Sequence, residues 1–285
     1  MLLESIVIVG FALLLDFLAG DPKTKYHPTA WIGKLIASLV PFTKSNSAKK
    51  ELLGGILLVS IIVIVVSTLL VVLDIGISLL TVDIVSLIVS IVVGSILLKT
   101  TIAIRGMQKH ALSVVDALEK DDLDSARNHL SMIVKRNTKN LDKNHISSAV
   151  LESVSENTVD GVTGPLFYYA IFGLPGAFVY RAINTIDSMI GYKTSLFRNI
   201  GWFGANCDTI LNYIPSRLTG LVMILSALIL GYNWKESFYI MKRDGRKLES
   251  PNAGFPIAAL AGALGTRSEE RRVGKECRSR WSPCP

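Results

Sequence analysis

The residues best suited to chemistry gather in one region, between residues 152 and 217. Carboxylates, amides and arginines recur there among glycine, proline and aromatic residues, directly beside segments apolar enough for a lipid bilayer. An ionisable side chain is costly in hydrocarbon, so a group of them kept at a membrane edge indicates a functional site. Acids mixed with amides and arginines suit a metal–phosphate or carboxylate ligand better than an apolar one.

The first candidate pair is Glu156 and Asp160, which are four residues apart. They share one face if the helix extends that far. Two carboxylates on one face can hold Mg²⁺, so both are predicted metal ligands and catalytic acids. The alternative is a solvated helix end before the break at Gly161.

The second candidate set is Arg181, Asn184 and Asp187, spaced three residues apart and so placed on one helix face. Arg181 is predicted to clamp a phosphate or carboxylate, and Asn184 to bind substrate beside it. Asp187 is predicted to hold a metal or to orient an amine. The alternative is an arginine–aspartate network at the membrane edge that only fixes packing.

Two further sets flank the apolar segments. Asp208 and Asn212 are four residues apart and are followed by Arg217. They are predicted to supply a catalytic acid and two substrate-binding groups, unless they form a helix cap beside an arginine that reaches out to water. Asp21 and His27 follow the first apolar run and are candidate substrate-binding residues, although a single histidine is often structural.

The pattern of apolar runs predicts an all-α, polytopic membrane protein with a small cytoplasmic helical insertion. Half of the chain is hydrophobic and its mean hydropathy is +0.44. Residues 52–73 carry no charge and residues 75–98 carry only Asp83. At 1.5 Å per residue each run can cross a bilayer core of about 30 Å. With residues 2–20 they give an N-terminal membrane part, 1–98, made of one span and a helical hairpin that turns at Asp74.

Residues 161–265 are predicted to be a polar signature region with broken and spanning helices. The uncharged stretch 161–180 contains Pro165 and Pro175, so we expect a broken or re-entrant segment. Residues 218–234 form a further candidate span, and 253–265 begin another that is too short. Lysines between the first two runs place that loop in the cytoplasm. A re-entrant segment would put both polar stretches on the same cytoplasmic face.

The remaining segments are a soluble insertion and an unusual tail. Residues 99–160 balance acids and bases, and the spacing of Leu112, Val115 and Leu118 predicts two or three amphipathic helices. Residues 266–285 lose the apolar pattern and resemble translated sequencing-adapter read-through. We therefore treat this tail as non-native and expect it to make few contacts with the fold.

Several function classes lack support in the sequence. Two of the three cysteines lie in the tail and Cys207 stands alone, so neither a disulfide framework nor a cysteine-based zinc site is indicated. No P-loop, H-E-x-x-H or G-x-S-x-G motif occurs. The net charge of +7 fits loops beside anionic lipid, and we expect no nucleic-acid partner.

The residues together resemble one known family. The opening LLLDFLAGDP…HPTAWIGKLI, the central ENTVDGVTGPLFYYAIFGLPGAFVYRAINTIDSMIGYK and the later LNYIPSRLTGL and SPNAGFPIAALAGALG are similar to the adenosylcobinamide-phosphate synthases, membrane enzymes of cobalamin biosynthesis. The resemblance runs from about residue 11 to 265. The family usually carries adjacent acids where this chain has Asp208-Thr209, with Ala-Arg-Leu before them where Ala205-Asn206-Cys207 stands.

The resemblance implies ATP-dependent amide formation. The propionate carboxylate of adenosylcobyric acid would be joined to (R)-1-amino-2-propanol or its O-phosphate, with Mg²⁺ and ATP as co-substrate and an acyl phosphate between the two steps. It also implies a multi-pass protein of the cell membrane with a cytoplasmic active face, and association with other enzymes of cobalamin assembly. The candidate groups have the types this chemistry needs: Glu156, Asp160, Asp187 and Asp208 for metal or base, and Arg181 and Arg217 for phosphate.

Two other classes of function stay open. One is a corrinoid transport-associated membrane protein, which would typically show paired repeats and polar residues at the membrane midplane. Neither feature is evident in the sequence, because the polar groups lie outside the cleanest apolar runs. The other is a non-catalytic membrane scaffold for corrinoid enzymes.

Overall fold

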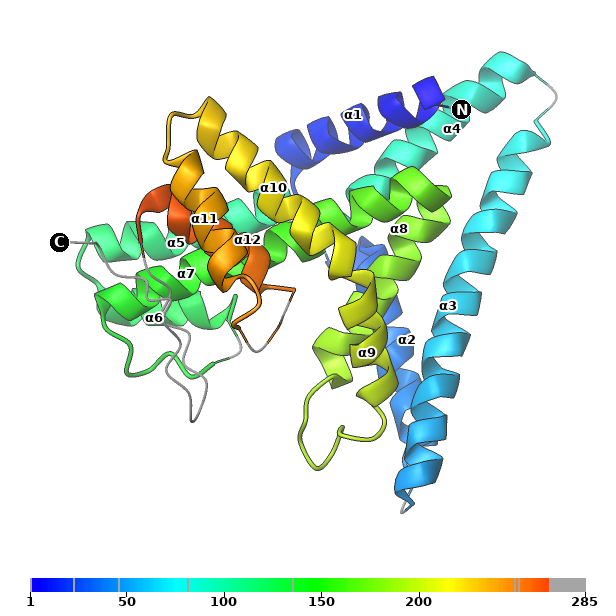
Figure 1. Cartoon of the computed structure of the whole chain (residues 1–285). Helices are drawn as coiled ribbons and strands as arrows, with labels where there is room; N and C mark the ends of the chain where they lie inside the picture. Colours follow the sequence, from blue (N-terminus) through cyan, green and yellow to red (C-terminus); the bar gives the residue numbers. More distant parts are fainter. Residues whose placement is uncertain are drawn as a thin grey trace. The chain divides into compact units, whose positions relative to one another are not determined.

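The computed structural model describes residues 2–22, 24–45, 47–80, 82–134, 136–248, 250 and 252–266 (Figure 1). Within these residues all the regular secondary structure is helical. The chain divides into two compact units. Unit 1 comprises residues 1–104 and 160–211, and unit 2 comprises 105–159 and 212–285.

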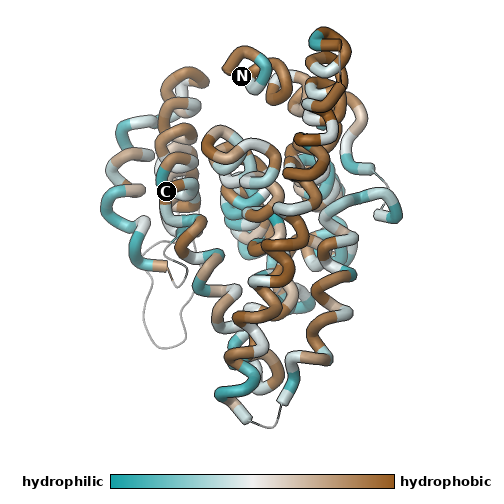
Figure 2. Tube along the Cα trace, turned by 90° about the vertical axis from the view of Figure 1, so that its right-hand side faces the viewer, coloured by the Kyte–Doolittle hydropathy of each residue, from teal (hydrophilic) through white to brown (hydrophobic). Residues whose placement is uncertain are grey.

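Unit 1 is built from long apolar helices. They are α1 (Leu2–Ala19), the 3-10 helix η1 (Thr24–Tyr26), α2 (Pro28–Thr43), α3 (Ala48–Ser78), α4 (Asp83–Lys99), α8 (Gly164–Ile190) and α9 (Trp202–Leu211). Apolar residues cover most of the length of the long helices in Figure 2. A helix satisfies its own backbone hydrogen bonds, which is why apolar segments adopt it in lipid.

Helix α3 buries one face in the protein and exposes the other. Its side chains Leu58 and Ile62 are fully buried, whereas Ile64 is 62% and Leu69 66% exposed. Within the described residues, four helical segments are long and apolar enough to cross a membrane, and a fifth is added if α9 and α10 form one broken span. The prediction of an all-α, multi-pass membrane protein is therefore confirmed.

The hairpin between α3 and α4 turns later than predicted. Asp74 lies inside α3, and the helix ends only at Ser78. The next helix begins at Asp83, and the Ser86 hydroxyl donates a hydrogen bond to the Ile77 carbonyl across the turn. The prediction of a turn at Asp74 is wrong because one exposed acid near the end of a span can reach the interface without stopping the helix.

Small residues let the helices of unit 1 approach closely. A Cβ added to Gly55 of α3 would lie 2.1 Å from the Ile200 carbonyl oxygen, so only glycine fits there. A Cβ added to Gly94 of α4 would lie 3.0 Å from Ile8 Cδ1 of α1, and the Ser95 hydroxyl donates to the Ile8 carbonyl. Close packing and hydrogen bonds of this kind drive helix association in membranes, where the hydrophobic effect between helices is weak.

Helix α8 is folded back on itself. Gly173 has φ 65° and ψ −154°, which interrupts the helix two residues before Pro175. A Cβ added to Gly164 would lie 2.2 Å from the Tyr180 ring, and the Tyr168 and Tyr180 rings stack at 5.3 Å. In a straight helix, residues 164 and 180 would be about 24 Å apart. The predicted break is confirmed, and its two arms form a helical hairpin that pivots at Gly173.

Unit 2 contains shorter and more polar helices. They are α5 (Ile104–Glu119), α6 (Leu123–Ser131), α7 (Lys143–Thr158), α10 (Tyr213–Ile229), α11 (Trp234–Asp244) and α12 (Gly254–Leu264). Helices α5–α7 lie in the segment that was predicted to be a soluble helical insertion. Its buried core includes Val114, Leu118, Leu130 and Ile146.

The buried stripe of α5 is rotated from the predicted one. Leu112 is 49% and Val115 38% exposed, whereas Val114 and Leu118 are buried. The prediction was therefore wrong for Leu112 and Val115, where the buried face lies one position away, and correct for Leu118. In the C-terminal part of unit 2, Ile257 of α12 packs in one cluster with Leu151 of α7.

Candidate functional site

The α8 hairpin places Asp160 beside Arg181. Helix α7 ends at Thr158, and residues Val159–Thr163 form a π-helix. The Arg181 Nη1 donates to the Asp160 carbonyl oxygen at 3.1 Å. The Tyr180 hydroxyl contacts Asp160 Oδ1 at 3.5 Å. Two groups 21 residues apart in the sequence thus meet because the chain reverses at Gly173.

Arg181 and Asn184 extend this contact to α9. The Arg181 Nη1 also reaches Asn184 Oδ1 at 3.4 Å, and the Asn184 amide donates to Asp208 Oδ1 at 3.2 Å. The Asn184 residue is only 7% exposed. The Arg181 Nε is buried without a hydrogen-bond partner among the described residues. A buried donor without a partner is rare, and a water, an ion or a ligand atom can satisfy it.

Asp187 lies one helical turn beyond Asn184, at the end of α8. It is within electrostatic range of Asp160, so the two carboxylates belong to the same region of unit 1. A Cβ added to Gly191 would lie 2.1 Å from Asp187 Oδ1, so the glycine leaves room for this carboxylate. The face predicted from Arg181, Asn184 and Asp187 is therefore realised on the second arm of α8.

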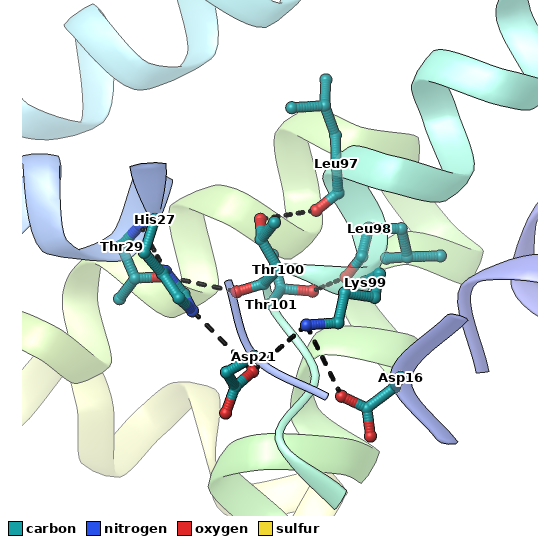
Figure 3. A network of polar contacts seen from close by, with 9 residues as sticks. All are labelled: Asp16, Asp21, His27, Thr29, Leu97, Leu98, Lys99, Thr100 and Thr101. Carbon is teal, nitrogen blue, oxygen red and sulfur yellow. Dashed lines mark hydrogen bonds and ion pairs between the residues drawn. The ribbon is translucent and has the colours of Figure 1, made fainter. Parts of the chain in front are cut away.

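A second polar network lies where α1, α2 and α4 meet (Figure 3). The Lys99 Nζ is 3.3 Å from Asp21 Oδ1 and 3.9 Å from Asp16 Oδ1. Asp21 Oδ1 is also 3.9 Å from His27 Nε2. The Lys99 and Asp16 side chains are 7% and 1% exposed, whereas Asp21 is 36% exposed. Sequence reasoning had singled out Asp21 and His27 but assigned no role to Lys99 or Asp16.

The hydrogen bonds of His27 define its protonation. Its Nδ1 accepts from the Thr29 backbone N–H at 3.3 Å and caps α2, so the ring hydrogen lies on Nε2, toward Asp21. Burial lowers the pKa of His27; Asp21 opposes this effect, and Arg181 and Lys99 add to it. A neutral imidazole with Nδ1 occupied can donate from Nε2 but cannot act as a base. Because Arg181 and Lys99 both act electrostatically on His27, the Lys99 network and the Arg181 cluster lie within electrostatic range of the same residue.

Three predicted residues belong to unit 2. Glu156 is exposed near the end of α7, and Asn212 is 4% exposed immediately before α10. Arg217 is stacked on aromatic rings, with its guanidinium carbon 3.5 Å from the Tyr213 ring centroid. Glu156 lies near the end of α7 and Asp160 in the π-helix that follows it directly, so the sharing of one face by these two residues stays a prediction.

Asn206 and Thr209, which depart from the usual pattern of the resembled family, form hydrogen bonds within their own helix. The Asn206 amide donates to the Trp202 carbonyl at 2.7 Å, and the Thr209 hydroxyl donates to the Ala205 carbonyl at 2.8 Å. Both side chains are exposed on α9. Asp208 is the residue of this segment that bonds into the cluster with Asn184.

The described part of the chain contains no group of three His, Cys, Asp or Glu side chains placed to hold a metal ion. Nucleotide-linked Mg²⁺ typically uses one or two carboxylates together with phosphate oxygens and water. Asp160 and Asp187 supply hard oxygen donors of that kind in one region, so the residues present fit a phosphate-bound Mg²⁺.

Comparisons with known proteins give a consistent match. A family model described as CobD/Cbib protein matches residues 9–277. The probable cobalamin biosynthesis protein CobD of Methanothermobacter thermautotrophicus is 41% identical over 271 residues, covering 95% of this chain and 86% of the relative. The cobalamin biosynthesis protein CobD of Leptospira interrogans is 43% identical over 257 residues, with 90% and 79% covered. That of Clostridium perfringens is 39% identical over 264 residues, with 92% and 81% covered. No solved structure matches the chain.

Proposed function

The chain belongs to the CobD/Cbib family, and we propose that it is an acid–amine ligase of cobalamin biosynthesis. It joins the propionate carboxylate of adenosylcobyric acid to (R)-1-amino-2-propanol or its O-phosphate at the expense of ATP. The support is the family match, the names of its relatives as cobalamin biosynthesis proteins, and a polar cluster among apolar helices of unit 1.

The observation that carries the proposal is the state of Arg181. Its Nη1 is anchored on Asp160 and Asn184, while its buried Nε has no hydrogen-bond partner in the described residues. A guanidinium oriented in this way is suited to an anionic oxygen, because its donors form a rigid fork. We assign it to the phosphate or carboxylate that carries charge during the reaction.

The reaction consists of two steps. The substrate carboxylate oxygen attacks the γ-phosphorus of ATP, which gives an acyl phosphate and ADP. The amine then attacks the acyl carbon, so that the C–N bond forms, phosphate leaves and a proton is released. When bound, Mg·ATP supplies the phosphoryl group that turns the carboxylate oxygen into a leaving group.

The chain's own carboxylates have distinct tasks in this scheme. Asp187, on the same arm of α8 as Arg181, orients the substrate ammonium and takes its proton. Asp160 would hold Mg²⁺ together with phosphate oxygens. Asn184 fixes Asp208, and His27, whose Nε2 lies 3.9 Å from Asp21 Oδ1, donates from that nitrogen to an oxygen of the bound substrate. Arg181 stabilises the charge that develops on the transferred phosphate.

The location of the reaction follows from its co-substrate. We place the site on the cytoplasmic side of the cell membrane, where ATP is available. The lysines between α1 and α3 support this orientation through the positive-inside tendency.

Product analysis tests the proposal against the alternatives. The purified full chain is incubated with adenosylcobyric acid, the amine or its O-phosphate, and Mg·ATP, and the corrinoid product is identified by mass spectrometry. An amide product supports the ligase. Corrinoid binding without turnover, or corrinoid uptake by vesicles containing the protein, would instead support the scaffold or the transport-associated protein.

A further inference from the structure

Arg217 in unit 2 is held rigidly before any ligand binds. Its guanidinium carbon lies 3.5 Å from the Tyr213 ring centroid and 4.2 Å from the Phe255 ring centroid. The Nη1 donates to the Tyr213 carbonyl and to the Ser216 hydroxyl. Among the described residues, Nε and Nη2 make no hydrogen bond. The stacked faces and the occupied Nη1 direct the remaining donors to one edge of the guanidinium.

The aromatic ring of Phe255 is fixed by close packing. A Cβ added to Gly245 would lie 3.1 Å from Phe255 Cδ1, and one added to Gly254 would lie 2.3 Å from the Gly245 carbonyl oxygen. The Ser237 hydroxyl of α11 donates to the Ala259 carbonyl of α12 at 2.7 Å. Helices α11 and α12 thus hold the ring in place, so Arg217 is pre-organised by the fold.

The charges around Arg217 are unbalanced. Two titratable residues act on it electrostatically: Tyr213, on whose ring it stacks, and the cation Arg246. Its neighbours Arg243 and Lys247 are both paired with the buried carboxylate of Asp244. Among the described residues, neither Arg217 nor Arg246 forms an ion pair. Arg246 opposes the positive charge of Arg217 electrostatically, and a bound anion would offset that repulsion.

We propose that Arg217 and Arg246 form a phosphate-binding site in unit 2. A phosphate ester carries up to two negative charges and three acceptor oxygens, which suit two guanidinium groups better than a carboxylate does. The phosphate is that of the phosphorylated amine or of the nucleotide. The proposal deepens the proposed function, on which this choice of ligands rests.

Calorimetric binding to the purified full chain tests the site. The first arm compares 1-amino-2-propanol O-phosphate with 1-amino-2-propanol, and the second compares Mg·ADP with adenosine. The variants are Arg217→Lys, which keeps the charge but loses the planar fork, and Arg246→Gln. Lys242→Gln is the matched control, because Lys242 is exposed on α11 and forms no hydrogen bond or ion pair with the described residues.

Each arm has a defined outcome. In one arm, we expect both variants to lower the affinity for the phosphorylated ligand by about tenfold or more. The affinity for the unphosphorylated ligand of that arm should not change. The affected arm identifies the source of the phosphate. Unchanged binding in both arms, or an equal loss with Lys242→Gln, would overturn the site. Since Arg246 is exposed, its variant decides the matter if Arg217→Lys fails to fold.

The two proposals can fail separately. If the wild-type chain makes the amide but its affinity for the phosphorylated ligands does not depend on either arginine, the ligase proposal is supported and the site proposal is wrong. If phosphate binding depends on both arginines but no amide forms, the site stands and the ligase is wrong.

Discussion

Replacing Lys99 with Met perturbs the buried polar network of unit 1 directly. The Lys99 ammonium lies 3.3 Å from Asp21 and 3.9 Å from Asp16, and the Lys99 and Asp16 side chains are 7% and 1% exposed. Methionine keeps much of the volume and a similar helix propensity while removing the charge. Removing one partner of a buried ion pair costs about 3–5 kcal/mol, because the other charge loses its compensation.

The expected cost lies at the low end of this range. The Asp21 side chain is 36% exposed and becomes hydrated once the ammonium is gone. Asp16 stays buried without the nearby ammonium, so we expect Lys99→Met to lower the free energy of unfolding by about 3 kcal/mol. This corresponds to a change of roughly 100-fold in the folding equilibrium constant.

Equilibrium unfolding in mixed detergent, followed by circular dichroism, measures this difference. Lys34→Met is the control, because Lys34 is exposed on α2, and its effect should stay within about 0.5 kcal/mol. Asp16→Leu should destabilise the Lys99→Met background less than it destabilises the wild type, because the attraction between the two side chains is already lost there. The reasoning is refuted if Lys99→Met is as stable as Lys34→Met, or if Asp16→Leu destabilises both backgrounds equally.

Three further predictions concern single residues. Asp187→Asn should lower product formation at least about 100-fold at an unchanged yield of folded protein, because it removes the charge that orients the amine; near-normal turnover per folded molecule would remove Asp187 from the catalytic residues. Gly55→Ala should lower the free energy of unfolding by about 1–3 kcal/mol, since its Cβ would lie 2.1 Å from the Ile200 carbonyl oxygen. Gly76→Ala on the same helix is the control, because its Cβ meets nothing within 4 Å and should not destabilise the protein. Equal effects of the two substitutions would contradict the close packing at Gly55. The pKa of His27 is lowered in the folded state, so stability should fall as the pH drops below about 6.5, where the unfolded chain takes up the proton first; His27→Asn, which keeps a cap acceptor, should flatten this dependence, and an unchanged pH slope would argue against it.

The long helices could be predicted because their signal is local. Residues 52–73 are apolar without interruption, and the structure extends that run into α3, Ala48–Ser78. The break in α8 was also readable, because Pro175 and its neighbouring glycines disfavour a straight helix. The pivot at Gly173 itself, and the direction in which the second arm returns, depend on packing between Gly164 and Tyr180.

The polar contacts were only partly predictable. Arg181 and Asn184 share a face by spacing alone, and the structure keeps that face. The contact between Asp16 and Lys99 joins residues 83 positions apart, and no local pattern pairs them. A charge at the end of each of two apolar runs was the available signal. The π-helix after Thr158 has no simple sequence pattern, so the sequence did not predict it between Glu156 and Asp160.

The most direct test of the ligase uses an oxygen label. Adenosylcobyric acid carrying ¹⁸O in its free propionate carboxylate is incubated with the full chain, the amine O-phosphate and Mg·ATP. Formation of an acyl phosphate predicts one amide per ADP released, with one ¹⁸O atom transferred to each inorganic phosphate. The absence of amide, or amide formed without transfer of ¹⁸O to phosphate, would contradict the proposed reaction.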